Sequence, residues 1–173
     1  MKYHKIGNEF YMDHGEMKKK KKVIFLDDKI LCKYIGPDNV GVDELKVIKL
    51  KLLSMITKAQ IILISDDRYE IYKMHKAYIP YNQFKSEHNR LIYLLRKYNI
   101  KIDGVTPSSI NKRKCDEILT WLSRNERGTL KYIILSTKNN DFNALNNKVI
   151  LCKYGLRLRH IYKIYKKLNY TVF

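Results

Sequence analysis

The chain is poor in glycine, proline and cysteine. Its 173 residues include only 7 Gly and 3 Pro, which excludes a fibrous or low-complexity chain. The 3 Cys, at positions 32, 115 and 152, show no CxxC spacing and indicate neither a disulfide framework nor a zinc site. No apolar run approaches membrane-spanning length, and no signal-like apolar stretch follows the N-terminal charges. The sequence therefore predicts a single intracellular domain, cytoplasmic or nuclear, with no membrane partner and an oligomeric state that stays open.

Acidic residues are also scarce. There are 17 Asp and Glu against 35 Lys and Arg, a formal net charge of +18. Such a surplus favours polyanionic partners, RNA or DNA first. A coding bias toward Lys, Asn, Ile and Tyr is the alternative source of the charge, and both readings stay open. Residues 1–21 form a basic N-terminal extension, and the lysine run Lys18–Lys22 lies at its end. This run is either a phosphate-binding or nuclear-import segment, or a solvated lead-in.

Four short apolar runs predict strands that are covered on both faces. They are Val23–Leu26, Ile61–Ile64, Tyr132–Leu135 and Lys148–Cys152. Asp43 is expected to cap a helix whose apolar face should lie on the sheet. That face consists of Leu45, Ile48, Leu52, Leu53, Met55 and Ile56. Two segments, Ile35–Val42 and Asp103–Pro107, are expected to form loops or turns.

Three further helices are expected, at Arg68–Lys76, at Lys85–Tyr98 and after Ser108 or Ser109, followed by an amphipathic helix after Gly155. The last helix has a basic face that is a candidate nucleic-acid-binding surface, formed by Arg157, Arg159, Lys163, Lys166 and Lys167. At least two of its tyrosines fall at core spacing and are expected to face the sheet. The alternation of strands and helices predicts one α/β domain over residues 22–173, with a doubly wound, Rossmann-like, mostly parallel sheet.

Polar clusters follow three of the predicted strands. They are Asp27-Asp28, Ser65-Asp66-Asp67 and Ser136-Thr137. In a doubly wound sheet, ligands bind at the carboxyl ends of the strands, so these clusters mark the expected site. The acids at these strand ends also have a purely structural reading, as helix caps.

These clusters, in this order, resemble the haloacid dehalogenase (HAD) superfamily of phosphatases. The segments Gly104–Pro107, Glu117-Ile118, Trp121-Leu122 and Asp141-Phe142 are similar to the HAD domains of RNA-repair proteins. The resemblance covers about Lys22 to Leu168 and implies a HAD-type fold. It also implies an aspartate nucleophile after the first strand and a second aspartate two residues later. A phosphate-binding Ser or Thr, a phosphate-neutralising cation and Mg²⁺-binding acids complete the family's site.

The chain departs from that pattern at the carboxylates. If Asp27 is the nucleophile, Lys29 stands at the acid/base position; if Asp28 is the acid/base, Leu26 stands at the nucleophile position. Ser136-Thr137-Lys138 stands where the later strand should end in acids. The resemblance leaves Asp27 as a residual nucleophile position, and the phosphate-binding set as Ser65, Arg113 and Lys114, of which Arg113 fits the family best. An active site would hold Mg²⁺ through Asp27, Asp28 and Asp141.

We therefore expect a catalytically inactive HAD-like domain that needs no cofactor and acts by binding nucleic acid or a protein partner. The alternative is a divergent Mg²⁺-dependent phosphatase that acts on nucleic-acid ends or small phosphoesters. A third reading is a viral accessory protein that presents a surface, with Ile79–Phe84 as the candidate segment, to a host protein.

Overall fold

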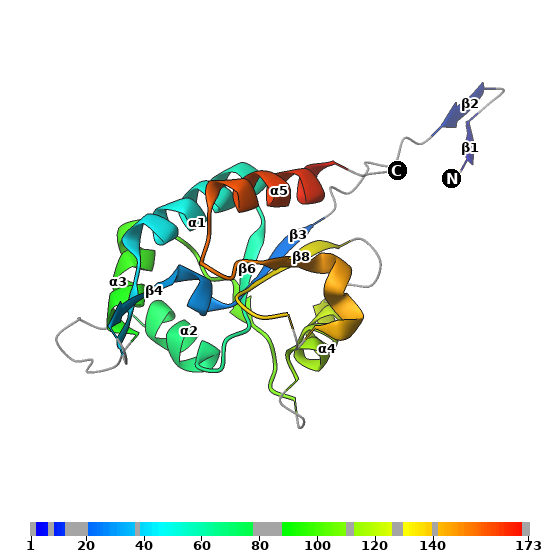
Figure 1. The fold of residues 1–173 in the computed structure, drawn as a ribbon. Coiled ribbons are helices and arrows are strands. Elements are labelled where there is room, and N and C mark those ends of the chain that lie inside the picture. Colours follow the sequence, from blue (N-terminus) through cyan, green and yellow to red (C-terminus); the bar gives the residue numbers. More distant parts are fainter. Residues whose placement is uncertain are drawn as a thin grey trace.

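A parallel sheet lies at the centre of the fold (Figure 1). The computed structural model describes residues 3–6, 9–12, 21–36, 39–77, 88–109, 113–125, 130–139 and 142–170. The five strands are β3 (Lys22–Leu26), β6 (Gln60–Leu63), β7 (Gly104–Val105), β8 (Lys131–Ser136) and β9 (Val149–Leu151). Their spatial order is β7-β6-β3-β8-β9, and every pairing is parallel. The chain adds β6 and β7 on one side of β3 and then β8 and β9 on the other side, which confirms the doubly wound α/β fold.

The central strand is buried on both faces because its side chains alternate between two apolar clusters. Val23 and Phe25 belong to one cluster, and Ile24 and Leu26 belong to the other. All four side chains are at most 1% exposed. A continuous apolar run is therefore what this strand requires, as the sequence predicted.

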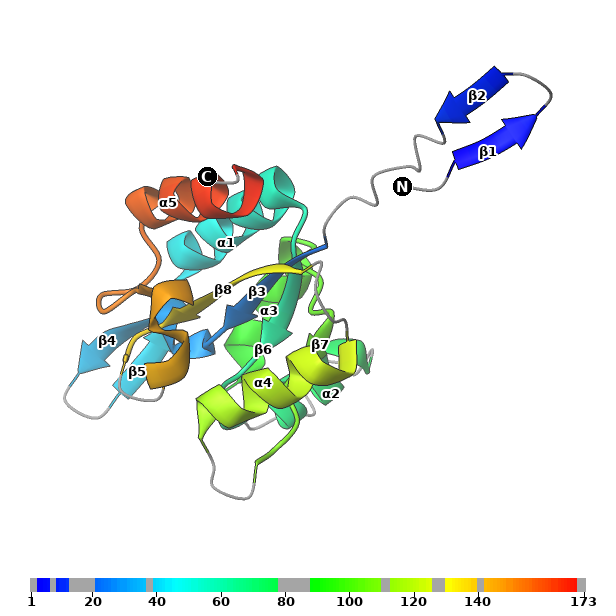
Figure 2. The same ribbon diagram turned by 90° about the vertical axis from the view of Figure 1, so that its right-hand side faces the viewer.

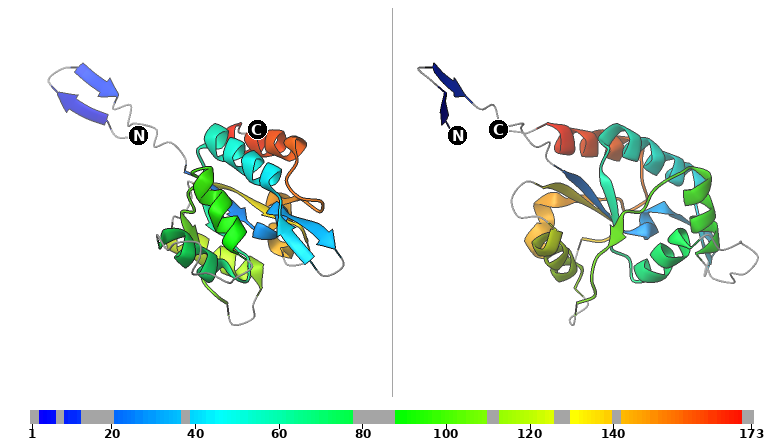
Figure 3. Two further views of the ribbon diagram at one scale, coloured as in Figure 1. Left: turned by 90° about the vertical axis from the view of Figure 1, so that its left-hand side faces the viewer. Right: turned by 180° about the vertical axis from the view of Figure 1, so that it is seen from behind.

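Helices cover the two faces unequally. The face of Ile24 and Leu26 packs against α1 (Glu44–Thr57), α2 (Arg68–Lys76), α3 (Asn89–Lys97) and α5 (Leu158–Asn169). The opposite face packs against α4 (Lys114–Asn125) and the 3₁₀ segment η3 (Asn143–Lys148) (Figures 2 and 3). Phe25 meets Trp121 of α4 edge-on, with ring centroids 5.3 Å apart. None of the helices in the described part of the chain is long and apolar enough to cross a bilayer.

Helix α1 begins where the sequence predicts, but it faces the other way. The Asp43 side chain accepts a hydrogen bond from the Leu45 N–H at 3.0 Å, so the predicted cap is confirmed. The predicted buried face is wrong, because of its members only Leu53 is buried. The side against the sheet is instead formed by Val47, Leu50, Leu53 and Thr57. Because α1 is apolar on both sides, its periodicity did not identify the side that packs.

Two segments predicted as loops contain strands. Residues 35–42 lie largely within an antiparallel pair, β4 (Cys32–Gly36) and β5 (Asn39–Val42). Of the predicted turn residues, Gly36 ends β4 and Asn39 begins β5, whereas Pro37 and Asp38 lie outside the described residues. The two strands are too short to show a clear period. The predicted turn Asp103–Pro107 contains β7, which pairs with Ile62 and Leu63 at the edge of the sheet. A two-residue strand likewise carries no period.

The ends of other predicted elements also shift. A second antiparallel pair, β1 (Tyr3–Ile6) and β2 (Glu9–Met12), lies in the N-terminal extension, where no strand was expected. Helix α3 begins at Asn89, and residues 85–87 of the predicted helix lie outside the described residues. The segment Ile79–Phe84 also lies outside them.

Gly155 sets the start of α5. Its φ is +86°, a left-handed conformation that side chains disfavour, and an added Cβ would collide with the Lys46 side chain. The turn that it makes lets the Leu156 N–H donate to the Ile30 carbonyl at 3.2 Å. Ile30 belongs to the 3₁₀ turn η1 (Asp28–Leu31) that directly follows β3. The entry to α5 is therefore tied to the carboxyl end of the central strand.

Candidate functional site

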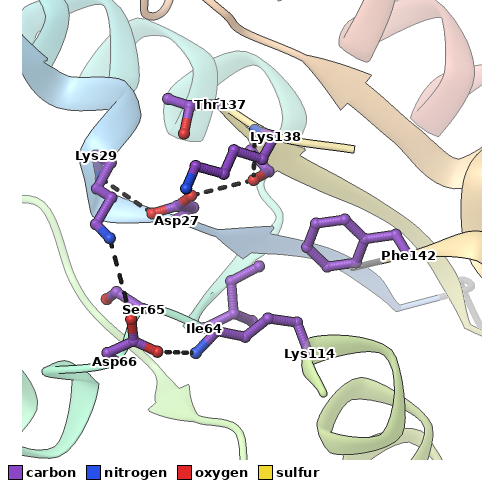
Figure 4. A pocket seen from close by; sticks show the side chains of 10 residues that line it. Asp27, Lys29, Ile64, Ser65, Asp66, Lys114, Thr137, Lys138 and Phe142 are labelled. Carbon is purple, nitrogen blue, oxygen red and sulfur yellow. Dashed lines mark hydrogen bonds and ion pairs between the residues drawn. The ribbon is translucent and has the colours of Figure 1, made fainter. Parts of the chain in front are cut away.

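A pocket of about 250 Å³ opens at the carboxyl ends of β3, β6 and β8 (Figure 4). This is the topological switch point, where the chain changes sides of the sheet. The pocket is lined by Asp27, Lys29, Ile64, Ser65, Asp66, Lys114, Ser136, Thr137, Lys138 and Phe142. It contains residues from all three polar clusters that the sequence placed there. Its charged side chains are three lysines and two aspartates.

Both oxygens of the Asp27 carboxylate already have protein partners. Oδ1 accepts the Lys29 backbone N–H at 3.2 Å, which makes Asp27 the N-cap of η1. Oδ2 accepts the Ser136 hydroxyl at 3.1 Å, and that hydroxyl accepts the Lys138 N–H at 3.2 Å. The Lys138 side chain extends across the pocket toward Asp27 (Figure 4). The strand-end carboxylate is therefore held by a backbone amide and a hydroxyl group beside a lysine.

Asp28 is not among the residues that line the pocket. It lies in η1 and is buried. Burial raises the pKa of its carboxyl group, the neighbouring Ser65 hydroxyl lowers it, and the charge of Asp27 raises it further. Asp27 and Asp28 therefore differ in their surroundings and do not form a carboxylate pair that faces a common ligand.

Asp66 is the second carboxylate of the pocket, and lysines surround it. Lys114 Nζ lies 2.6 Å from Asp66 Oδ1, and Lys29 Nζ lies 4.0 Å from Oδ2. The hydrogen bond from Lys114 is the main reason that the pKa of Asp66 is lowered, and burial opposes it. Lys114 also lies 3.8 Å from Glu117 Oε2. Lys29 and Lys114 therefore both approach Asp66, while the Lys138 side chain lies near Asp27 (Figure 4).

A buried ion pair holds the loops near Asp66. Arg68 and Glu117 are each 3% exposed, and Arg68 Nη2 lies 2.9 Å from Glu117 Oε1. The same guanidinium donates to the carbonyl oxygens of Ser65 and Thr106 at 2.9 Å and of Pro107 at 3.2 Å. It thereby joins the loop after β6, the segment after β7 and the first turn of α4. Charges so deep in a protein persist only when they are paired and hydrogen-bonded.

Sequence reasoning missed this pair. A signal was present, because Glu117 lies next to the apolar stripe of Cys115 and Ile118, on the side of the helix that packs. A carboxylate on a packing face requires a buried cation. Arg68, at the start of the next helix after the second strand, was the available candidate.

The structure brings some of the predicted site residues together and separates others. Asp27, Ser65 and Lys114 line the pocket, accompanied by Lys29 and Lys138. Arg113 is exposed and is not among the lining residues. Asp141 lies outside the described residues.

The described donors do not fit Mg²⁺. Among residues 21–170, apart from the undescribed gaps, no three His, Cys, Asp or Glu side chains gather in a way that could hold a metal ion. Asp28 does not line the pocket, and Asp27 and Asp66 are bound by hydroxyl, amide or ammonium groups. Mg²⁺ requires several oxygen ligands in octahedral geometry, and nearby ammonium groups oppose a divalent cation.

The basic face of α5 is a second positively charged surface. All five predicted residues, Arg157, Arg159, Lys163, Lys166 and Lys167, are exposed. The expectation that at least two tyrosines of this helix face the sheet is wrong: Tyr162 is 60% exposed, and Tyr165 packs edge-on against Tyr170. The sheet side consists of His160, Ile161, Ile164 and Leu168. Lys166 Nζ lies 4.6 Å from the centre of the Tyr162 ring, so cations and an accessible aromatic ring share this face.

Comparison with protein-family models, with curated proteins and with solved structures returns no match. The chemistry of the pocket and of α5 is therefore the basis for assigning a function.

Proposed function

We propose that this protein is a catalytically inactive HAD-like domain, a pseudo-phosphatase, that acts by binding the phosphate groups of nucleic acid. The observation that carries the proposal is the composition of the pocket, where Lys29, Lys114 and Lys138 surround a space edged by hydroxyl groups. Charge-assisted hydrogen bonds from ammonium groups to phosphate are among the stronger polar contacts in proteins. A cavity of about 250 Å³ suits one phosphate-bearing end better than a long stretch of strand.

The α5 surface supports the same partner. Exposed cations attract the phosphate backbone, and exposed tyrosine rings offer stacking surfaces to bases. The formal charge of +18 adds long-range attraction to any polyanion. A protein with this partner works inside the cell, in the cytoplasm or nucleus, and a role as a viral accessory protein is compatible with it.

A specific observation favours one competing function. Asp27 lies in the pocket at the end of β3, where the HAD resemblance places the nucleophile. A divergent Mg²⁺-dependent phosphatase would use this carboxylate to attack the phosphate. Against this, Asp27 is engaged by Ser136 and the Lys29 N–H, and Asp28 does not reach the pocket.

Binding of short single-stranded oligonucleotides that differ only in a terminal phosphate tests the proposal. Fluorescence anisotropy in EDTA should show tighter binding of the 5′- or 3′-phosphorylated strand than of the hydroxyl-ended strand. Lys138→Gln should remove most of that difference and raise the Kd of the phosphorylated strand at least about tenfold, because one charge-assisted hydrogen bond contributes about 1.5–3 kcal/mol. Lys73→Gln, which removes an exposed lysine from α2, is the matched control and should leave the difference unchanged.

Two further variants separate the pocket from α5. Arg159→Gln and Lys163→Gln should each weaken the binding of the phosphorylated and the hydroxyl-ended oligonucleotide by the same factor. Each should also reduce the slope of log Kd against log salt by about 0.7 for every phosphate that the variant no longer neutralises. Equal affinity for phosphorylated and hydroxyl ends, with no effect of Lys138→Gln, would refute the role of the pocket.

A further inference from the structure

The outer face of α1 carries an apolar stripe that nothing in the described chain covers. Leu45 and Met55 are 66% and 60% exposed, and Ile48, Leu52 and Ile56 are 39% to 41% exposed. These positions recur at intervals of three and four residues, so they form one line along the helix. The helix already buries its other side against the sheet. A helix that is apolar on two sides is typical of one that packs between two partners.

Helix α5 lies alongside α1 (Figures 1 and 3). Lys22 Nζ donates to the Thr57 carbonyl and to the Asn169 side chain, so the C-terminal ends of the two helices meet. Both helices therefore run in the same direction. α5 contributes exposed apolar side chains of its own, Leu158 and Tyr162, which enlarge the apolar area of this helical layer.

The charges around the stripe are basic. Lys49 and Lys58 flank it on and just after α1, and Lys166 is exposed on the neighbouring α5. The acid at the start of α1, Glu44, is engaged by Lys97 at 2.7 Å and by the Tyr98 hydroxyl. An apolar line within a cationic rim is complementary to a helix that has an apolar face and acidic flanks.

Two other occupants fit less well. A second copy would bring the same lysines and a second charge of +18 against the first. The stripe is also only about 21 Å long, since a helix of 14 residues rises about 1.5 Å per residue, and this is short for a stable isologous dimer of about 800 Å² per partner. The N-terminal segment of this chain carries the run Lys18–Lys22, which repels the same rim.

We propose that the outer face of α1, with the adjoining side of α5, docks an acidic amphipathic helix of a partner protein. The apolar stripe supplies the buried contact, and the lysines favour a partner helix whose flanking side chains are acidic. This surface uses none of the pocket residues. Tyr162 and Lys166 also belong to the α5 surface proposed for nucleic acid, so a docked helix would compete with nucleic acid there. Variants of the pocket and of α1 test the two proposals separately, because neither changes a residue of α5.

A designed helical peptide, with leucines at heptad positions a and d and glutamates on its flanks, is the probe. Its affinity is measured by fluorescence anisotropy at about 0.15 M ionic strength, where long-range attraction is screened beyond about 8 Å. A scrambled peptide of identical composition is the first control. The designed peptide should bind at least about tenfold tighter than the scrambled one, since only it presents a continuous apolar face.

The variant Leu45→Gln/Met55→Gln changes the two most exposed side chains of the stripe. Because both lie outside the core, the fold should stay intact. It should weaken the designed peptide at least about tenfold. Leu119→Gln, which changes an apolar residue of α4 that is 44% exposed, is the control and should have no effect. Phosphorylated-oligonucleotide binding by the double variant should be unchanged.

Three results would overturn the proposal. One is equal affinity of the protein for the designed and scrambled peptides, or equal affinity of the wild type and the double variant for the designed peptide. Another is a dimer in sedimentation that dissociates in the double variant, which would assign the face to a second copy. The third is binding to vesicles of anionic lipid that the double variant loses, which would assign the face to a membrane surface.

Discussion

Removal of the Glu117 charge tests how the pocket is held together. Glu117→Gln keeps the shape of the side chain and an acceptor oxygen for Arg68, but it leaves the guanidinium buried without its counter-ion. Loss of one member of a buried ion pair costs about 3–5 kcal/mol. In a protein of this size each kcal/mol lowers Tm by about 2–4 °C, so Tm should fall by about 6–20 °C.

Urea unfolding followed by circular dichroism measures the free energy of unfolding, and an unchanged m-value shows that the unfolding transition is comparable. Asp116→Asn is the matched control, because it makes the same chemical change on the preceding residue, which is half-buried and not part of the pair. It should cost less than about 1 kcal/mol. If Glu117→Gln costs no more than Asp116→Asn, the Arg68–Glu117 pair does not stabilise the loops of the pocket and the reasoning is refuted.

Three other substitutions test the fold around the site. Burial, followed by the charges of Arg159, Arg157 and Lys163, lowers the pKa of His160 below 6.5, so its neutral form contributes stability that is complete above pH 6.5 and is lost as the pH falls. His160→Gln, which keeps an acceptor for the Arg157 N–H, should flatten the loss of Tm between about pH 7 and 5; an unchanged profile would contradict this. Phe25→Ala should cost about 3–5 kcal/mol in urea unfolding, and a loss below about 1 kcal/mol would mean that the contact with Trp121 is not made. Gly155→Ala should cost about 1–2 kcal/mol because of its positive φ, whereas a neutral effect would show that the turn is not left-handed.

The centre of the sheet could be predicted because each buried strand is an uninterrupted apolar run. Val23–Leu26 and Tyr132–Leu135 need partners on both faces, which a parallel sheet between helices provides. The cap at Asp43 could be predicted equally well, since its carboxylate directly precedes a helical period. Local chemistry determines these features.

Other features depend on contacts that local patterns do not encode. The packing side of α1 could not be chosen, because Leu45 and Leu50 belong to apolar lines on opposite sides of one helix. The strand β7 is defined only by its pairing with β6, and the β4–β5 hairpin only by two short segments that meet. Both segments were predicted to be loops because they contain turn residues, but those residues occupy only part of each segment.

The position of the site could be predicted better than the contacts within it. Strand ends located the pocket, because parallel strands deliver their following residues to one edge of the sheet. Sequence alone could not show that Lys114 enters the pocket while Arg113 stays exposed, since this depends on the helix beginning at Lys114 and leaving Arg113 outside it. Nor could it show that Asp28 turns into the interior at η1.

The most direct test of a non-catalytic phosphate-binding pocket is a calorimetric titration of the protein with a 5′-phosphorylated oligonucleotide, in EDTA and again in millimolar Mg²⁺, with the nucleic acid recovered afterwards. We expect the same affinity in both buffers and an oligonucleotide that keeps its phosphate, because lysines and hydroxyl groups supply the binding. Binding that requires Mg²⁺, together with release of inorganic phosphate that disappears in Asp27→Asn, would contradict the account.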